Sequence, residues 1–249
     1  MPTFGRRWLQ RTALTTAAAV VAATAAAAVA PGAAQAVTPG VSGTLSTVAR
    51  GVTENSDCTV SPSTEDSLTY SPNGATRRSA SATGGTTTSD LDGTDTASWS
   101  GATSSKVTAK RTATTATVTF SASVRAQISA VKGASSVCVP GVEADAIASS
   151  TFTVPKAGWM TLRASTTGRA SLVLGLVPVT GVVRPVQIVA FDPSTYAGKA
   201  WVRPGKYTVE IQAIAAADVD PSTPARSSAA GAVTASVSVQ PSSTGKVTR

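Results

Sequence analysis

An antiparallel β-sandwich is the fold class that this sequence predicts. The first observation is the alternation at 115–131, where Ala, Val, Phe and Ile take the even positions and Thr, Ser, Arg and Gln take nearly all the odd ones. Successive side chains of a strand point to opposite faces, so this stretch has one apolar and one polar face. The second observation is a series of short alternating runs separated by Gly and Pro, which is typical of antiparallel sandwiches.

The first 36 residues predict a cleaved signal peptide rather than part of the fold. Arg6, Arg7 and Arg11 form a basic start, and residues 13–30 form an apolar run of Ala, Val and Thr. Small residues at 34 and 36 then predict cleavage after Ala36. The paired arginines leave Sec and twin-arginine export both open. No second apolar span follows, so we expect a secreted chain with no membrane segment after signal removal.

The composition of the mature chain excludes several function classes. Loss of three of the 21 basic residues leaves a net charge of +5 against 13 acidic residues. Lys and Arg are scattered, whereas nucleic-acid binding favours a clustered basic stripe. The chain has no histidine, the commonest general base and metal ligand. We therefore expect no enzyme activity, no catalytic residues and no cofactor.

Two cysteines, Cys58 and Cys138, predict one disulfide. In an exported chain a single pair of cysteines is expected to be oxidised, although two free thiols are the alternative. The bridge would close a loop of about 80 residues and contribute ~4 kcal/mol in the chain-entropy model. A core built largely from Ala and Val needs such support, because small side chains each bury little area.

The elements of the N-terminal half centre on a hairpin. Its long second strand is 115–131, and a change of alternation phase places a turn near 111–114. Seventeen residues extend ~55 Å as a strand, so this strand must bend, bulge or break. Other elements expected here are an edge strand within 37–51, a short strand at 67–70, a turn at 71–74, and a loop or loosely held edge strand at 76–95.

The C-terminal half predicts a second series of short strands. A helical turn is expected at 142–148, and the chain after Pro241 is expected to be a flexible tail (241–249). Strands are expected at 151–154, 159–164, 172–177, 186–191, 207–213 and 233–239. The favoured organisation is two small jelly-roll-like sandwiches, 37–141 closed by the disulfide and 142–240, with a single larger sandwich as the alternative.

The C-terminal half also carries strings that resemble a known family. They are F-T-V-P-K-A-G at 152–158, L-V-L at 172–174 and V-R-P-G-K-Y-T-V-E-I at 202–211. Over residues 147–240 the chain resembles bacterial pre-peptidase C-terminal domains. The resemblance implies a small secreted β-sandwich, of a kind found beside hydrolases or in surface proteins, some of which bind calcium or polymers. Ser171 stands where many members have Asp, which argues against an inherited metal site.

Two groups of residues are candidate sites. Asp90, Asp92 and Asp95 surround a glycine and are weak calcium candidates, although their spacing is not that of an EF-hand and a solvated turn is the simpler interpretation. The ligand-stacking candidates are aromatic, with burial in the core as the alternative. They are Trp99, Trp159 and Trp201.

These observations predict a non-catalytic secreted bacterial protein that acts as a surface- or wall-associated binding or structural module. A carbohydrate- or polymer-binding module is one alternative, and an accessory domain or remnant of an exported hydrolase is another. The mild positive charge favours an anionic cell-wall polymer or glycan as partner. The wealth of Ala, Val and Thr is typical of proteins from high-GC bacteria.

Overall fold

The computed structural model describes residues 38–53, 60–61, 63–90, 93–130, 140–178, 186–190, 193–219 and 225–242. Within these ranges the chain forms thirteen strands and no helix, and so nothing there resembles a membrane-spanning helix. The strands are β1 (Gly40–Thr53), β2 (Val60–Ser61), β3 (Ser63–Tyr70), β4 (Gly74–Asp90), β5 (Gly93–Arg111), β6 (Ala116–Ala130), β7 (Pro140–Val154), β8 (Gly158–Gly168), β9 (Ser171–Pro178), β10 (Val186–Ala190), β11 (Ser194–Val202), β12 (Gly205–Asp218) and β13 (Ala225–Pro241).

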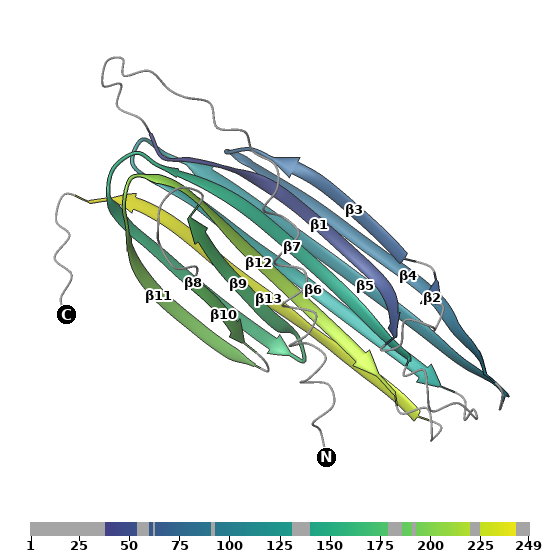
Figure 1. Cartoon of the computed structure of the whole chain (residues 1–249). Coiled ribbons are helices and arrows are strands. Elements are labelled where there is room, and N and C mark those ends of the chain that lie inside the picture. The colour runs from purple at the N-terminus through teal and green to yellow at the C-terminus, as the bar shows by residue number, and fades with distance from the viewer. Residues whose placement is uncertain are drawn as a thin grey trace. The chain divides into compact units, whose positions relative to one another are not determined.

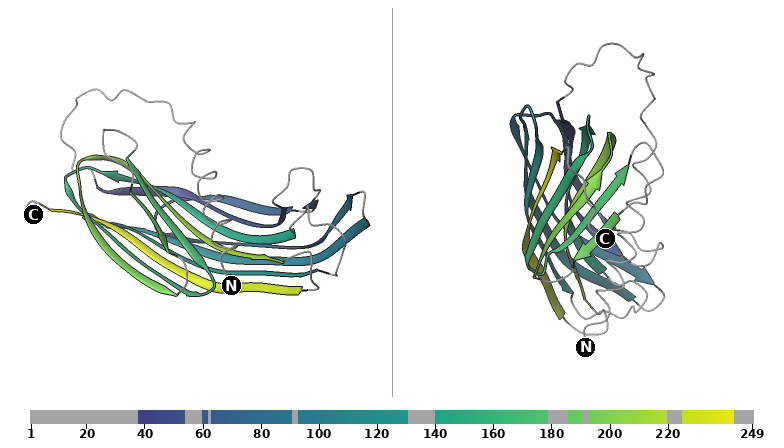
Figure 2. Two further views of the ribbon diagram at one scale, coloured as in Figure 1. Left: turned by 60° about the horizontal axis from the view of Figure 1, so that its bottom comes forward. Right: turned by 90° about the vertical axis from the view of Figure 1, so that its left-hand side faces the viewer.

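These strands form two antiparallel sheets that stack face to face (Figure 1). One sheet has six strands in the order β10-β9-β12-β7-β1-β3, and the other has seven in the order β11-β8-β13-β6-β5-β4-β2. The inner faces of the two sheets share one hydrophobic core, and Figure 2 shows the two layers from other directions. The predicted antiparallel β-sandwich is therefore confirmed.

The sandwich is single, so the prediction of two small sandwiches divided at residues 141 and 142 is wrong. Residues Thr38–Arg249 form one compact unit. β1 pairs with β7 along its whole length, and β6 pairs with β13 in the same way, so each sheet combines strands from both halves of the chain. The stretch 147–240 accordingly does not form a sandwich of its own, and the alternative of one larger sandwich holds.

β6 is a central strand, as the alternation of its sequence predicts. The expected hairpin turn is present, because the Thr112 amide donates to the Thr115 carbonyl at 2.8 Å and the two hydroxyls lie 2.7 Å apart. One-to-one pairing with β5 and β13 continues over the strand without a break. All of its described inward side chains are buried: Ala116, Val118, Phe120, Ala122, Val124, Ala126 and Ile128.

β7 replaces the predicted helical turn at 142–148. Over 142–148 its inner face carries alanines, including Ala144 and Ala146, and its outer face carries Glu143 and Asp145. Alanine and carboxylate residues are depleted in strands, so local preference points away from this conformation. Pairing with β1 on one side and β12 on the other overrides that preference.

The remaining expectations concern the edges of the sheets. The described parts of 76–95, residues 76–90 and 93–95, are strand rather than loop, because β4 pairs with β5 from Gly74↔Ala109 to Asp90↔Gly93. Only the two-residue β2 lies beyond β4 in this sheet, so the edge-strand alternative is close to what is found. β1 is not an edge strand, since it lies between β7 and β3. The turn predicted at 71–74 is present, with Asn73 in the left-handed region at φ 68° and its amide bonded to the Ala109 carbonyl at 2.7 Å.

Candidate functional site

The three candidate tryptophans separate into one core residue and one surface pair. Trp99 points into the sandwich and is 3% exposed, so it packs the core rather than stacking on a ligand. Trp159 and Trp201 are register partners on β8 and β11 and are half-buried on the outer face of the seven-stranded sheet. Their ring centroids lie 5.1 Å apart at an interplanar angle of 75°. This edge-to-face pair does not provide the coplanar rings of a flat sugar-stacking platform.

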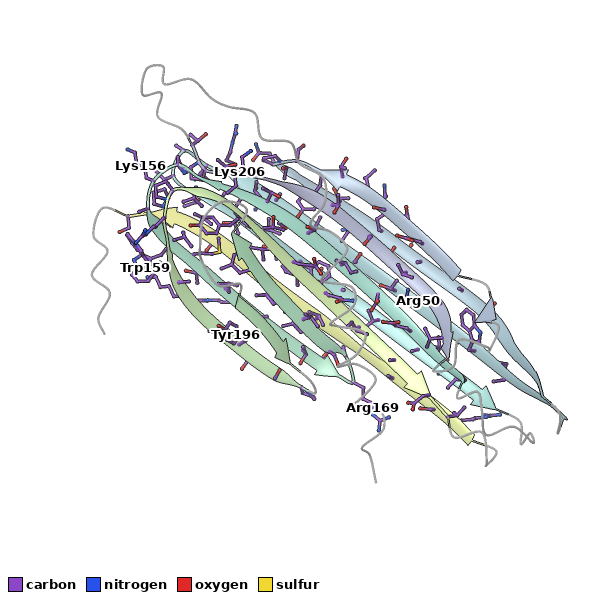
Figure 3. The ribbon with its side chains drawn as sticks, viewed as in Figure 1. Arg50, Lys156, Trp159, Arg169, Tyr196 and Lys206 are labelled. Atoms are coloured by element: carbon purple, nitrogen blue, oxygen red, sulfur yellow. The ribbon has the colours of Figure 1, made fainter. Side chains whose placement is uncertain are left out.

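One basic side chain contacts this pair, and others lie at the same end of the sandwich. The Lys199 ammonium lies 4.5 Å from the ring centroid of Trp159, which is a cation–π contact. Lys156, in the turn between β7 and β8, and Lys206, at the start of β12, lie at the same end of the sandwich (Figure 3). Arg203 lies in the turn between β11 and β12, next to the last residue of β11. We call Lys156, Trp159, Lys199, Trp201 and Arg203 the basic aromatic tip; Lys206 is not included, because its register with Thr153 places it on the outer face of the six-stranded sheet.

The outer face of the seven-stranded sheet continues this positive charge. Because paired residues of neighbouring strands share a face, the ladders place hydroxyl side chains and cations together on it. Thr117, Thr119, Ser121 and Ser123 on β6 are typical of its composition. No carboxylate faces outward from this sheet among the side chains that the structure describes. The cations of this basic face are Arg77, Lys106, Lys110, Arg125, Arg163, Lys199 and Arg226.

A groove of about 440 Å³ lies on the basic face where β5, β6 and β13 run side by side. Ser98 pairs with Ser129, and Ser129 pairs in turn with Arg226, so the three form one row across the strands. The next outward row is Ser100, Gln127 and Ser228. The outward lining is thus one guanidinium, one carboxamide and four hydroxyl groups, and we call it the serine groove.

The outer face of the six-stranded sheet has the opposite character. The register of β3, β7, β1 and β12 places acidic side chains on this face. Its only described cations are Arg50 and Lys206. The acidic residues are Glu65, Glu143, Asp145, Glu210 and Asp218.

Two of these carboxyl groups form a buried cluster. Glu143 and Asp145 are 2% and 4% exposed. Arg50 on β1 donates to Glu143 Oε2 from Nε at 3.2 Å and from Nη2 at 2.9 Å, while Gln212 Nε2 on β12 donates to Asp145 Oδ2 at 3.4 Å. Burial first, and the neighbouring Glu143 carboxylate second, raise the pKa of Asp145 well above its usual range.

This cluster joins three strands rather than flanking a cleft. Carboxyl pairs that cleave glycosides stand on opposite sides of the scissile bond, whereas Glu143 and Asp145 are two positions apart on one strand face and within hydrogen-bonding reach of each other. The arrangement links β1, β7 and β12 through side chains. No local sequence pattern places Arg50 and Gln212 beside the two carboxyl groups, because they come from strands distant in sequence.

The other predicted sites lie partly or wholly outside the described residues. Asp92 is outside them, and only the backbones of Asp90 and Asp95 are described, on β4 and β5. Cys58, Cys138 and the predicted cleavage point after Ala36 are also outside. Within the described ranges, no group of three His, Cys, Asp or Glu side chains is close enough to hold a metal ion.

Comparison with known proteins gives no family for this chain, since no family model and no curated protein matches it. Two solved structures show weak likeness. The GH31 alpha-xylosidase from Xanthomonas citri is 9% identical, with 64% of this chain and 28% of that chain covered and a TM-score of 0.21. The structure of infectious bursal disease virus Gx strain is 8% identical, with 83% and 63% covered and a TM-score of 0.17. This chain thus spans less than two thirds of either, and likeness at this level supports no statement about fold or function.

Proposed function

We propose that this protein is a secreted, non-catalytic binding module that holds an anionic cell-wall polymer on its basic face. The observation that carries the proposal is the segregation of charge between the two outer faces. The outward cations of the seven-stranded sheet have no described carboxylate among them, whereas the outward carboxylates lie on the six-stranded sheet.

A face of one charge sign attracts a polyanion over its whole length. The summed field of separate cations raises the local concentration of an oppositely charged ligand, even where each single contact is weak. The hydroxyl groups between the cations supply hydrogen-bond donors and acceptors without requiring one ligand shape. Both features suit a flexible, repetitive polymer better than a small substrate.

The geometry favours a polyanion over a neutral glycan. Neutral sugar rings are commonly held by aromatic rings that lie flat against them, but Trp99 is buried and the Trp159 and Trp201 rings stand at 75° to each other. Lys199 lies against Trp159 and gives this pair a positive character as well. The basic aromatic tip therefore belongs with the basic face as part of one anion-binding surface.

The test is a salt series of binding measurements with the mature chain and an anionic wall polymer. Affinity should fall linearly with the logarithm of salt concentration, because binding releases counterions. Replacing Arg125→Gln together with Arg163→Gln should weaken binding by about tenfold at low salt, since two central cations of the face are lost.

A matched control keeps the change of net charge but moves it to the other face. Ser67→Glu with Thr69→Glu adds two negative charges at exposed positions of β3 on the six-stranded sheet. We expect this double variant to bind almost as the wild type does. Equal weakening by both pairs would show that net charge alone acts, and equal affinity for a neutral glycan or for DNA would refute the proposed ligand class.

A further inference from the structure

We infer that the serine groove is a second subsite for the same polymer and that it binds one phosphate-bearing, hydroxyl-rich repeat of a polyol-phosphate chain. This inference rests on the proposed function and adds to it the chemical class of the ligand and a requirement for length.

The groove's lining matches a ligand that carries both an anion and hydroxyl groups. The guanidinium of Arg226 presents paired N–H donors that fit the non-bridging oxygens of a phosphodiester. Gln127 and the serines both donate and accept, so they suit the hydroxyl groups of a polyol. The volume of about 440 Å³ lies within the usual range for a small-ligand site.

A second cation stands beside the groove. Arg169, in the turn after β8, donates from Nη1 to the carbonyl of Ser228 at 3.2 Å, and this serine lines the groove. Figure 3 places Arg169 far from Lys156 and Trp159. The groove thus has its own pair of guanidinium groups, independent of the basic aromatic tip.

The absence of an outward aromatic ring distinguishes this ligand from an acidic sugar polymer. Trp99 lies in β5 between two groove serines, but its ring is 3% exposed and belongs to the core. With the described outward side chains of the groove limited to Arg226, Gln127 and serines, a pyranose ring has no flat apolar partner there. An open-chain polyol phosphate needs none.

β13 connects the two subsites. Arg226 lies in the groove near the start of this strand, and Gln240 near its end pairs with Trp159 of the basic aromatic tip. Fourteen positions of strand separate them, which corresponds to about 45 Å at ~3.3 Å per residue. A single polymer lying along β13 would therefore occupy both subsites only if it is at least this long.

Two linked subsites make affinity depend on polymer length. Once one end is bound, the second contact is intramolecular and has a high effective concentration. We expect affinity to rise by about a hundredfold when the polymer first spans both subsites. Chains too short to span them should bind weakly, with two copies per protein.

The experiment is calorimetric titration of the mature chain with glycerol-phosphate oligomers of defined lengths on either side of ~45 Å. The wild type should bind two short oligomers or one long oligomer. Arg226→Gln should bind one oligomer of either length and lose the hundredfold rise. Ser67→Glu makes the same change of net charge at an exposed position of β3, on the outer face of the six-stranded sheet, and should keep both the stoichiometry and the rise.

Each outcome bears on a different part of the argument. If no polyanion binds to the wild type, the proposed function fails and this inference fails with it. Binding without a length threshold, and equal behaviour of the two variants, would overturn the second subsite alone. An equal threshold with polyglutamate, or tighter binding to phosphatidylglycerol vesicles than to the long oligomer, would overturn the assignment of a polyol-phosphate ligand.

Discussion

At the scale of single residues, the Asp145 carboxyl is held in an environment that disfavours its charge. It is 4% exposed, Oδ1 has no hydrogen-bond partner among the described residues, and the Glu143 carboxylate lies beside it. A buried acid next to another carboxylate is more easily kept protonated than ionised. The folded protein therefore binds a proton here at pH values where the unfolded chain releases it.

The first prediction concerns pH. Because the folded pKa of Asp145 is raised above the unfolded value of about 3.9, stability is greatest below that value and falls as pH rises towards the folded pKa, by on the order of 1 kcal/mol per pH unit. Burial also raises the pKa of Glu210, which acts in the same direction. Asp145→Asn retains the shape and needs no deprotonation, so its melting temperature should exceed that of the wild type at pH 7.5 and approach it at pH 4.

A melting temperature that is lower in this variant at both pH values would contradict the prediction. Glu65→Gln is the control, because Glu65 is an exposed carboxylate on the same sheet face.

The second prediction concerns an unpaired hydroxyl in the core. Thr103 is 3% exposed on the inner face of β5, and its Oγ1 has no hydrogen-bond partner in the described structure. Thr103→Val replaces this hydroxyl with a methyl group and should stabilise the fold by about 1 kcal/mol in chemical denaturation. Thr119→Val, on the exposed face of β6, is the control and should change stability little. If Thr103→Val lowers stability, the Thr103 hydroxyl has a hydrogen-bond partner after all and the prediction is wrong.

At the scale of elements, β1 is held between β3 and β7 by a close contact at Gly43. The Tyr70 hydroxyl of β3 reaches over this glycine and donates to the Ser149 carbonyl of β7 at 3.3 Å, with Ser150 Oγ also in contact. Burial raises the pKa of Tyr70 to about 12, although the Ser150 hydrogen bond partly opposes this shift. The Tyr70 side chain thus links β3 to β7 across β1.

The third prediction tests this contact. A Cβ on Gly43 would overlap the Ser149 carbonyl oxygen and press against the Tyr70 ring. Gly43→Ala should therefore destabilise the protein by at least ~2 kcal/mol in urea unfolding. Gly40→Ala lies on the same strand, where a Cβ meets only ordinary contacts with Thr153, and should be tolerated. If Gly40→Ala lowers the stability as much as Gly43→Ala does, the close contact at Gly43 is not the cause of the loss.

The fourth prediction is the disulfide. β1 ends at Thr53 and β7 begins at Pro140, and these two residues are register partners. In the sequence, Cys58 follows Thr53 by five residues and Cys138 precedes Pro140 by two. We expect non-reducing intact mass to show one bridge, and reduction to lower stability by ~4 kcal/mol at most. Alkylation of both cysteines without prior reduction would exclude it.

Sequence patterns at this scale succeed where one face is apolar and the other polar. β6 has that pattern over its whole length. Its hairpin with β5 was predictable because the apolar residues take odd positions up to Ala109 and even positions from Ala116, which requires a turn between them. β7 was not predicted, because the Ala, Glu and Asp residues of 142–148 favour a helix over a strand, and its partner strands β1 and β12 are distant in sequence. β11 (Ser194–Val202) was also missed, since its small and polar residues give little periodic signal.

At the scale of the whole molecule, residues Thr38–Arg249 form one compact unit rather than two. β6 lies between β5 and β13, so strands from the N-terminal and C-terminal halves of the chain are neighbours in one sheet. The candidate site depends on this arrangement, because the serine groove takes residues from β5, β6 and β13. The tryptophans could be chosen as candidates from the sequence. The separation of charge between the two outer faces could not be predicted, because it depends on the register of the strands in both sheets.

The fifth prediction follows from this interleaving. A chain truncated after residue 141 lacks nearly all of β7 and all of β13, which are the partners of β1 and β6. It should show no cooperative unfolding transition by circular dichroism, whereas residues 37–249 should show a single one. If fragment 37–141 unfolds cooperatively on its own, the prediction is wrong and the chain has two domains.

The positions of the first and last strands have a practical consequence for measurement. β1 begins at Gly40 opposite Thr153, and β13 ends at Pro241 opposite Gly158, so both meet the turn that carries Lys156. An affinity tag or sensor-chip linkage fused directly before Gly40 or directly after Pro241 would therefore be attached next to the basic aromatic tip and would shield it. A protein immobilised in this way would present Arg226 to the analyte and understate the contribution of the tip. Labels placed at Ser67 on β3, which is exposed on the outer face of the six-stranded sheet, avoid that bias.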